Sequence, residues 1–241
     1  MPSKLSAPTL VLVPGRPDPL ASWDTKRQAR YTSSGAVPSV HFLLDASGSM
    51  YNQVQPLLRA YHLTLWTLRP LLSPLTQVEV WAFRDTSELL RQGCLGTLEP
   101  LTAWDYTPSG DTRLKRALAN LLDATTSPGL HVLIVLSDGM DAPEDDGERA
   151  RVRALMTMRQ AESWLCIYLG AFPEALGEAL AIGFHEGNTV TFSRAHLLQA
   201  FAILQKGLQR FLTASAADQK LLAATGIFPD QFSEEISHGR G

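Results

Sequence analysis

Apolar residues along this chain follow two alternating periods. Short apolar runs, typical of strands buried on both faces, alternate with segments in which apolar residues recur at helical spacing. We expect strands at 40–44, 78–83, 131–136, 164–169 and 189–192, and a less regular strand and loop over 88–102. We expect helices at 54–68, 112–124, 148–162, 174–181 and 196–212. This alternation predicts an α/β fold with a parallel, doubly wound sheet.

The regular pattern occupies the middle of the chain. Residues 1–36 are rich in Pro, Ser and basic residues and predict an extended arm, which either carries an edge strand at 10–13 or is a disordered lead. We expect the α/β domain to span 37–212 and a partly flexible extension to span 213–241. Four apolar residues of the extension are expected to dock a short helix on the domain: Leu221, Leu222, Ile227 and Phe228.

Composition narrows the class of protein. The 241 residues are 45% hydrophobic, which is enough for one sizeable core. Lys and Arg number 21 against 24 Asp and Glu, so no basic excess points to nucleic acid. The apolar stretch at 10–13 is too short for a signal peptide, and no run of about 18 apolar residues could span a membrane. The two cysteines lie far apart and predict neither a disulfide nor a metal-ligand pair, so we expect a cytoplasmic protein.

Oxygen-bearing side chains stand at three places next to the expected strands and helices. Asp45, Ser47 and Ser49 come directly after the first strand, and Asp138 follows the most apolar strand. Thr112 opens the helix that precedes that apolar strand. In an open α/β sheet, ligands bind beyond the carboxyl ends of the strands. We therefore expect these five side chains to converge at one edge of the sheet.

The chemistry of these side chains favours a hard divalent cation. Two carboxylates and three hydroxyls supply the oxygen ligands that Mg²⁺ prefers, with Mn²⁺ and Ca²⁺ as alternatives. Gly48 and Gly139 let the loop backbones approach closely. A soft metal is disfavoured, because these segments contain neither Cys nor His.

Each oxygen cluster also has an ordinary structural interpretation. Ser49 could be the N-cap of a helix, and Asp111 or Thr112 could cap the next one. Asp138 and Gly139 alone would be a common turn. The DxSxS spacing after a buried strand is much rarer, and the three clusters together favour the metal site.

Three short motifs resemble the metal-ion-dependent adhesion site, or MIDAS, of von Willebrand factor A (VWA) domains. They are D-A-S-G-S at 45–49, G-D-T at 110–112 and S-D-G at 137–139. The resemblance covers about 37–212 and includes the order of strands and helices. It implies a Rossmann-like, mainly parallel sheet with one antiparallel edge strand, helices on both faces and a bound Mg²⁺.

The resemblance also implies roles for the motif residues. Ser47, Ser49 and Thr112 would bind the metal directly or exchange with water, and Asp45 and Asp138 would act partly through water. A carboxylate from another protein would fill the open position of the metal. In some members the final helix, here 196–212, slides when the site rearranges, whereas a rigid core helix is the alternative.

The rim of this site is expected to contact the partner. Its expected members are Gly48, Met50, Asp111 and Gly139. Asp111 departs from the family, which more often has Gly or Asn before the threonine. The extra carboxylate could raise the affinity for the cation or weaken the attraction for an acidic partner.

The site favours binding over catalysis. Hydrolysis at such a metal needs a general base or a second metal, and none of the six histidines is an obvious base. No P-loop is present. Our first hypothesis is a non-enzymatic, metal-dependent protein-interaction module. The sequence resembles short intracellular bacterial VWA proteins, which work beside AAA+ ATPases or in stress-response systems.

Two other hypotheses differ in class. The first is a metal-dependent hydrolase that acts on a phosphorylated ligand. The second is an RNA-linked role like that of Ro-type A domains, but the helical-repeat ring that accompanies that role is missing from the sequence.

Overall fold

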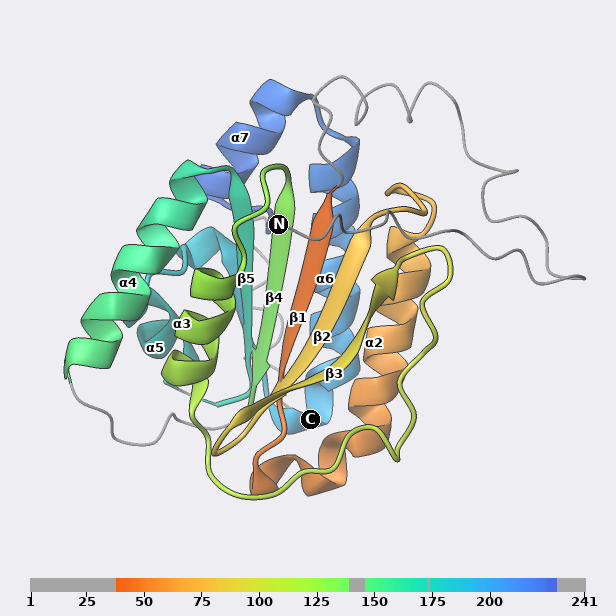
Figure 1. Cartoon of the computed structure of the whole chain (residues 1–241), viewed down its shortest axis with the longest axis vertical. Coiled ribbons are helices and arrows are strands. Elements are labelled where there is room, and N and C mark those ends of the chain that lie inside the picture. Colours follow the sequence, from red (N-terminus) through yellow and green to blue (C-terminus); the bar gives the residue numbers. More distant parts are fainter. Residues whose placement is uncertain (1–37, 139–145, 173, 229–241) are drawn as a thin grey trace, which may run out of the picture.

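A six-stranded sheet between two layers of helices forms the framework of the molecule (Figure 1). The computed structural model describes residues 38–138, 146–172 and 174–228. The strands lie in the order β3-β2-β1-β4-β5-β6, and neighbouring strands are parallel except for the antiparallel pair β2 and β3. The predicted α/β, doubly wound architecture with one antiparallel edge strand is therefore confirmed.

The strands and helices agree closely with the apolar pattern. The strands are β1 (Ser39–Asp45), β2 (Gln77–Phe83), β3 (Ser87–Cys94), β4 (His131–Ser137), β5 (Trp164–Gly170) and β6 (Thr189–Thr191). The α-helices are α2 (Val54–Leu68), α3 (Leu114–Ala124), α4 (Asp146–Ala161), α5 (Ala175–Ala181), α6 (Leu197–Thr213) and α7 (Ala216–Thr225). The 3-10 helices are η1 (Gly48–Gln53), η2 (Glu186–Asn188) and η3 (Arg194–His196).

The burial of each strand explains its sequence. Every residue of β1, β4 and β5 is buried, because helices cover both faces of the central sheet, and these strands are accordingly continuous apolar runs. Strand β2 alternates between buried and half-buried residues, and the edge strand β3 has no fully buried residue. A register shift between Val80 and Trp81 accompanies the pairing with β3, which fits the irregular pattern seen over 88–102.

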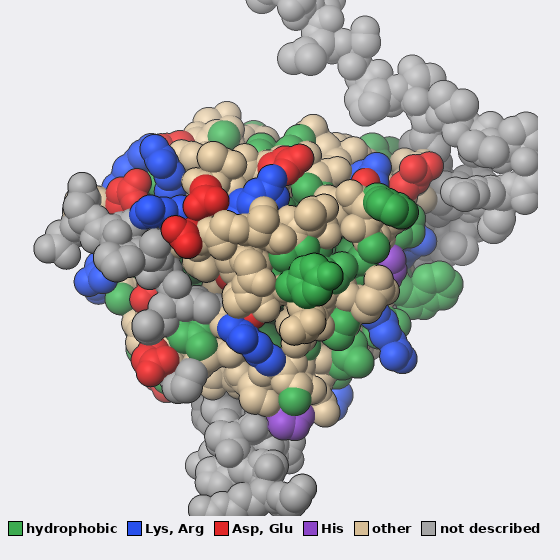
Figure 2. Space-filling view, turned by 90° about the horizontal axis from the view of Figure 1, so that it is seen from below, with side chains coloured by type: hydrophobic (Ala, Val, Ile, Leu, Met, Phe, Trp, Pro, Cys, Tyr) green, Lys and Arg blue, Asp and Glu red, His purple; other side chains and the backbone are tan. Residues whose placement is uncertain are grey.

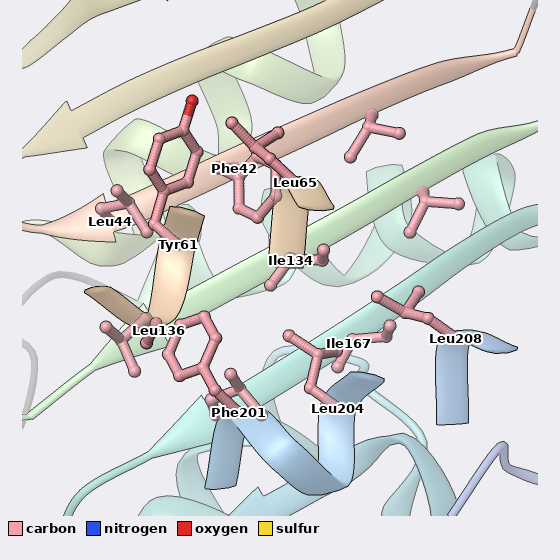
Figure 3. Packing of buried hydrophobic residues seen from close by; sticks show 14 of the residues in the cluster. Phe42, Leu44, Tyr61, Leu65, Ile134, Leu136, Ile167, Phe201, Leu204 and Leu208 are labelled. Carbon is pink, nitrogen blue, oxygen red and sulfur yellow. The ribbon is translucent and has the colours of Figure 1, made fainter. Parts of the chain in front are cut away.

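One half of the core lies between the sheet and the helices α2 and α6 (Figure 3). On β1 the ring of Phe42 meets Tyr61 of α2 edge to face, with 5.1 Å between ring centroids. Alternate residues of β4 and β5 join them against α6. Figure 3 labels ten members of this part of the core: Phe42, Leu44, Tyr61, Leu65, Ile134, Leu136, Ile167, Phe201, Leu204 and Leu208.

The other half of the core lies beneath α3, α4 and α5, which cover the opposite face of the sheet (Figure 1). The intervening residues of the same strands point this way, among them Leu133, Val135 and Cys166. Burial raises the pKa of the Cys166 thiol to about 12, so it is an inert core residue.

The described part of the C-terminal extension packs on the domain. Helix α7 begins after Ser215, whose hydroxyl accepts a hydrogen bond from the backbone N–H of Asp218. Ile227 and Phe228 are buried in the α2/α6 half of the core, whereas Leu221 is 60% exposed. The docking of this helix therefore rests mainly on the two residues that follow it. The predicted arm at 1–36 and its edge strand lie outside the described residues.

None of the described helices is long and apolar enough to cross a bilayer.

Replacement of Phe42 by Ala should reduce the free energy of unfolding by about 3–5 kcal/mol, because it leaves a cavity between β1 and α2. Urea denaturation followed by circular dichroism would measure the change. Leu221→Ala is the matched control and should alter stability by no more than about 0.5 kcal/mol. Equal effects of the two substitutions would contradict the assignment of this core.

Candidate metal centre

The two predicted aspartates meet because their strands are parallel neighbours. Strand β1 ends at Asp45, and β4 pairs with it in register, Leu44 opposite Leu136. Asp138 stands one residue beyond β4, so its position beside Asp45 follows directly from the pairing. The backbone N–H of Asp138 lies 3.4 Å from the Asp45 carboxylate.

Asp45 is fully buried, with 0% of its surface exposed. Its carboxylate accepts hydrogen bonds from the backbone N–H of Ser47 and from the Ser137 hydroxyl, both at 2.8 Å. Burial nevertheless raises the pKa of Asp45, and the nearby Asp138 charge adds to the effect. Folding therefore destabilises the charged form of Asp45, and a cation at this edge would stabilise it.

The two motif serines connect the first loop to Asp138. The hydroxyl oxygens of Ser47 and Ser49 are 3.0 Å apart. The Ser49 hydroxyl donates to Oδ1 of Asp138 over 2.6 Å, although the two residues are 89 positions apart in sequence. The structure thus brings Asp45, Ser47, Ser49 and Asp138 together at one edge, as the spacing predicts.

Thr112 reaches the same edge through the backbone of its loop. The N–H of Ser109 donates to the carbonyl of Ala46 at 2.8 Å, and the N–H of Gly48 donates to the carbonyl of Gly110 at 3.1 Å. These bonds hold the loop that carries Thr112 against the loop that carries the serines. The Thr112 side chain itself is buried.

The helix-cap interpretation of these hydroxyls is not realised. Helix α3 begins one residue later than the cap hypothesis requires, with Arg113 at its N-cap and no side-chain capping bond. Helix α2 has Gln53 at its N-cap, also without a capping side chain, and Ser47 makes no such bond to η1. Neither Ser49 nor Thr112 is therefore the N-cap residue of the helix that follows it.

The expected rim is only partly as predicted. Gly48 and Asp111 are exposed at the edge. Met50 is instead 1% exposed, because the η1 turn directs its side chain into the core, and it cannot line a binding rim. Gly139 lies outside the described residues.

Three further residues complete the site, and the sequence analysis missed them. Asp85 follows β2, and its Oδ1 accepts from the N–H of Asp111 at 3.3 Å. Tyr106 is buried, which raises its pKa, and its hydroxyl donates to the backbone carbonyl of Asp45. Arg194 places Nε 2.9 Å from Oδ2 of Asp138. Asp85 could have been found by the rule that ligands gather at the carboxyl ends of strands.

The residues present fit a hard divalent ion. The donor set consists of oxygen only, with two carboxylates for charge and neutral hydroxyls around them. Among the described residues, no three His, Cys, Asp or Glu side chains converge as a metal cluster, so this centre depends on the hydroxyls to complete its donor set. A soft metal, which prefers sulfur or imidazole, has no matching ligand among the four residues that meet here.

Comparison with known proteins adds to this geometry. A scan of protein-family models finds no match, and no curated protein matches the chain. Solved structures do match. The von Willebrand factor domain of the type V pilus tip protein Mfa5 from Porphyromonas gingivalis superposes with a TM-score of 0.52 and 11% identity, covering 75% of this chain and 97% of that one. This chain has the VWA fold.

Two other structures share the fold. The pilus adhesin SpaC from Lactobacillus rhamnosus GG gives a TM-score of 0.55 at 12% identity, over 73% of this chain and 30% of that chain. Proximal thread matrix protein 1 from the mussel byssus gives a TM-score of 0.54 at 16% identity, and the match covers 70% of this chain and 45% of that chain. The match spans less than half the length of each of these two proteins. At such identities the likeness concerns the VWA fold alone.

Asp45→Asn should stabilise the metal-free protein by about 1 kcal/mol, because it removes one of two neighbouring buried charges. The Ser137 hydroxyl can turn to accept from the new amide. Urea denaturation in EDTA would measure the change, with the exposed Asp123→Asn as the control. A loss of more than about 1 kcal/mol would show that the Asp45 charge is well compensated without metal.

Gly110→Ala should destabilise the loop that carries Thr112. Gly110 has φ +70°, and a Cβ there would lie 2.0 Å from Oδ2 of Asp85. We expect a loss of about 1–3 kcal/mol in urea denaturation. Gly177→Ala is the control, since a Cβ at that position in α5 has open space around it, and it should be neutral or slightly stabilising. Equal stability of the two variants would rule out strain at Gly110.

Proposed function

We propose that this VWA domain is a metal-dependent protein-interaction module, in which a bound cation accepts an acidic side chain from a partner protein. The single observation that supports this most strongly is the short contact between Ser49 and Asp138, which joins the loop after β1 to the residue that follows β4. Ser49 is exposed, whereas Asp45 is buried. The site is therefore closed towards the core and open to solvent on the side of Ser49.

In this proposal five side chains hold the ion. Ser47, Ser49 and Thr112 offer neutral oxygens, while Asp45 and Asp138 supply the negative charge. When bound, the cation supplies a positive centre that takes up a further oxygen ligand. Mg²⁺ is the proposed ion, with Mn²⁺ or Ca²⁺ as alternatives. A partner that lacks the acidic group would leave the cation without that ligand, which gives the interaction its specificity.

The surface around the site supports a protein partner. Figure 2 looks onto this edge from below, and hydrophobic side chains gather on its right, the side of α2 in Figure 1. Tyr51, next but one to Ser49, is 74% exposed, and Trp104, next but one to Tyr106, is 94% exposed. Large exposed aromatic residues beside a polar site are typical of protein-interaction surfaces.

Binding without catalysis is part of the proposal. His41 and His131 bond to each other at 3.2 Å, and His41 lies in the first half of β1, away from Asp45 at its end. His196 bonds to the hydroxyl of Ser193. Among the described residues, no histidine is hydrogen-bonded to the proposed metal ligands, so no observation favours the hydrolase alternative.

The cellular setting is proposed from the resemblance of the motifs. Short bacterial VWA proteins of this kind work in the cytoplasm as partners of AAA+ ATPases or in stress-response systems, and we propose the same for this chain. Two free cysteines, Cys94 and Cys166, are compatible with a reducing compartment.

Calorimetric titration with Mg²⁺ and Mn²⁺ tests the centre directly. The wild type should bind one ion, Asp45→Ala should not bind, and Thr112→Ala should bind about tenfold or more weakly. Thr213→Ala, at the exposed last residue of α6, is a control outside the donor set and should bind like the wild type. If the folded wild-type protein binds neither Mg²⁺ nor Mn²⁺, the proposal is refuted.

Capture from native lysate tests the interaction. A partner retained in Mg²⁺, released by EDTA and not retained by Asp45→Ala would be the expected result. The partner's binding should then be lost when its acidic residue is changed to the neutral amide. Turnover of a phosphate ester by the metal-loaded protein, lost in Asp45→Ala, would instead support the hydrolase.

A further inference from the structure

Arg194 is bound to the carboxylate that the proposed function assigns to the metal. Its Nε lies 2.9 Å from Oδ2 of Asp138, and its Nη2 donates to the backbone carbonyl of Asp138 at 3.1 Å. The Asp138 side chain is 2% exposed, whereas that of Arg194 is 49% exposed. The two carboxylate oxygens therefore differ: Oδ1 accepts the hydrogen bond from Ser49, whereas Oδ2 faces Arg194 as an ion pair and accepts no hydrogen bond from the described residues.

We infer that Arg194 is an internal counter-ion that competes with the divalent cation for Asp138 and so lowers the affinity of the site for metal. This inference rests on the proposed function, because it presumes that the oxygen cluster binds an ion. It assigns to Arg194 a role that no MIDAS motif residue has.

The charges of the site explain why a counter-ion is present. Asp45 and Asp138 together place two negative charges at one buried edge, and Arg194 offsets one of them in the metal-free protein. When a divalent ion joins the same carboxylate, the guanidinium becomes a neighbouring like charge, and the two repel each other. Binding of metal must therefore either displace the guanidinium or proceed against its charge, and both routes weaken binding.

The fold allows such a displacement without unfolding. The backbone at Arg194 is fixed, because the N–H of Phe192 donates to Gly170 at 2.9 Å and the buried Leu197 begins α6. The Arg194 side chain itself reaches the site across the surface, and half of it is open to solvent. Its guanidinium can therefore leave Asp138 by side-chain rotation, while η3 and α6 stay in place.

Titration with Mn²⁺ alone, followed by calorimetry, tests the inference on the full chain. Arg194→Gln should bind Mn²⁺ about 10- to 100-fold more tightly than the wild type, since one nearby charge shifts an ion equilibrium by that order. Arg194→Lys keeps the positive charge but cannot contact the carboxylate and the backbone carbonyl of Asp138 with two nitrogen atoms. Its affinity for Mn²⁺ should lie between those of the wild type and Arg194→Gln. Arg210→Gln is the control, because Arg210 lies in α6 and is bonded to the carbonyl of Ile227, and its affinity for Mn²⁺ should match that of the wild type.

The direction of the change separates this role from a structural one. Damage to the site would weaken Mn²⁺ binding, whereas loss of a competitor strengthens it. Melting temperatures in EDTA and in Mn²⁺ give a second readout, and the stabilisation by Mn²⁺ should be larger in Arg194→Gln than in the wild type. If Arg194→Gln does not fold, the affinity of Arg194→Lys decides.

Two negative results are distinguishable. Equal or weaker Mn²⁺ binding by a folded Arg194 variant would overturn the role of Arg194 and leave the metal centre standing. Absence of Mn²⁺ binding in the wild type and in every variant would overturn the metal centre, and the inference would fall with the proposed function.

Discussion

The architecture of the site depends on a carboxylate buried at the end of a central strand. A buried charge is costly unless surrounding groups satisfy it. Asp45 is partly satisfied from two directions at once, by Ser47 in the loop that follows it and by Ser137 at the end of β4. These bonds tie the first loop to the neighbouring strand and fix where Ser49 meets Asp138. The edge is therefore already organised in the protein alone, with a residual negative charge that favours a cation.

That organisation is possible because the sheet is parallel at its centre. Parallel neighbours end at the same edge, so β1 and β4 deliver their polar residues side by side without any long-range adjustment. The two halves of the core hold the strands rigidly from both faces, and Figure 3 shows the half that packs on α2 and α6. The third part of the donor set arrives differently, because Thr112 is brought in by a loop whose own contacts are backbone bonds and a close fit between Gly110 and Asp85. We therefore consider this loop the most sensitive part of the site.

The charge at this edge of the sheet depends on acidic and basic side chains that come from different elements. The buried acids Asp45 and Asp138 and the half-exposed Arg194 lie close to one another, and Asp111 adds an exposed acidic residue on the loop that packs against Gly48. A divalent ion would be added to a site that is already partly neutralised. Its affinity then depends on local competition as much as on the number of ligands. Such a site would suit the reversible protein interaction that we propose, and the exposed Tyr51 and Trp104 lie close to site residues in the sequence.

Much of this protein could be predicted from its sequence. The periods of apolar residues determined the strands, the helices and the parallel sheet, because burial on one or both faces imposes these patterns directly. The spacing of Asp45, Ser47 and Ser49 and the position of Asp138 after a buried strand predicted their meeting, since strand ends converge by topology. The tertiary structure alone decided the burial of Met50, the hydrogen bond from Tyr106 to the carbonyl of Asp45 and the pairing of Arg194 with Asp138. These depend on where a turn or a long side chain points after folding, which periodicity along the chain does not encode.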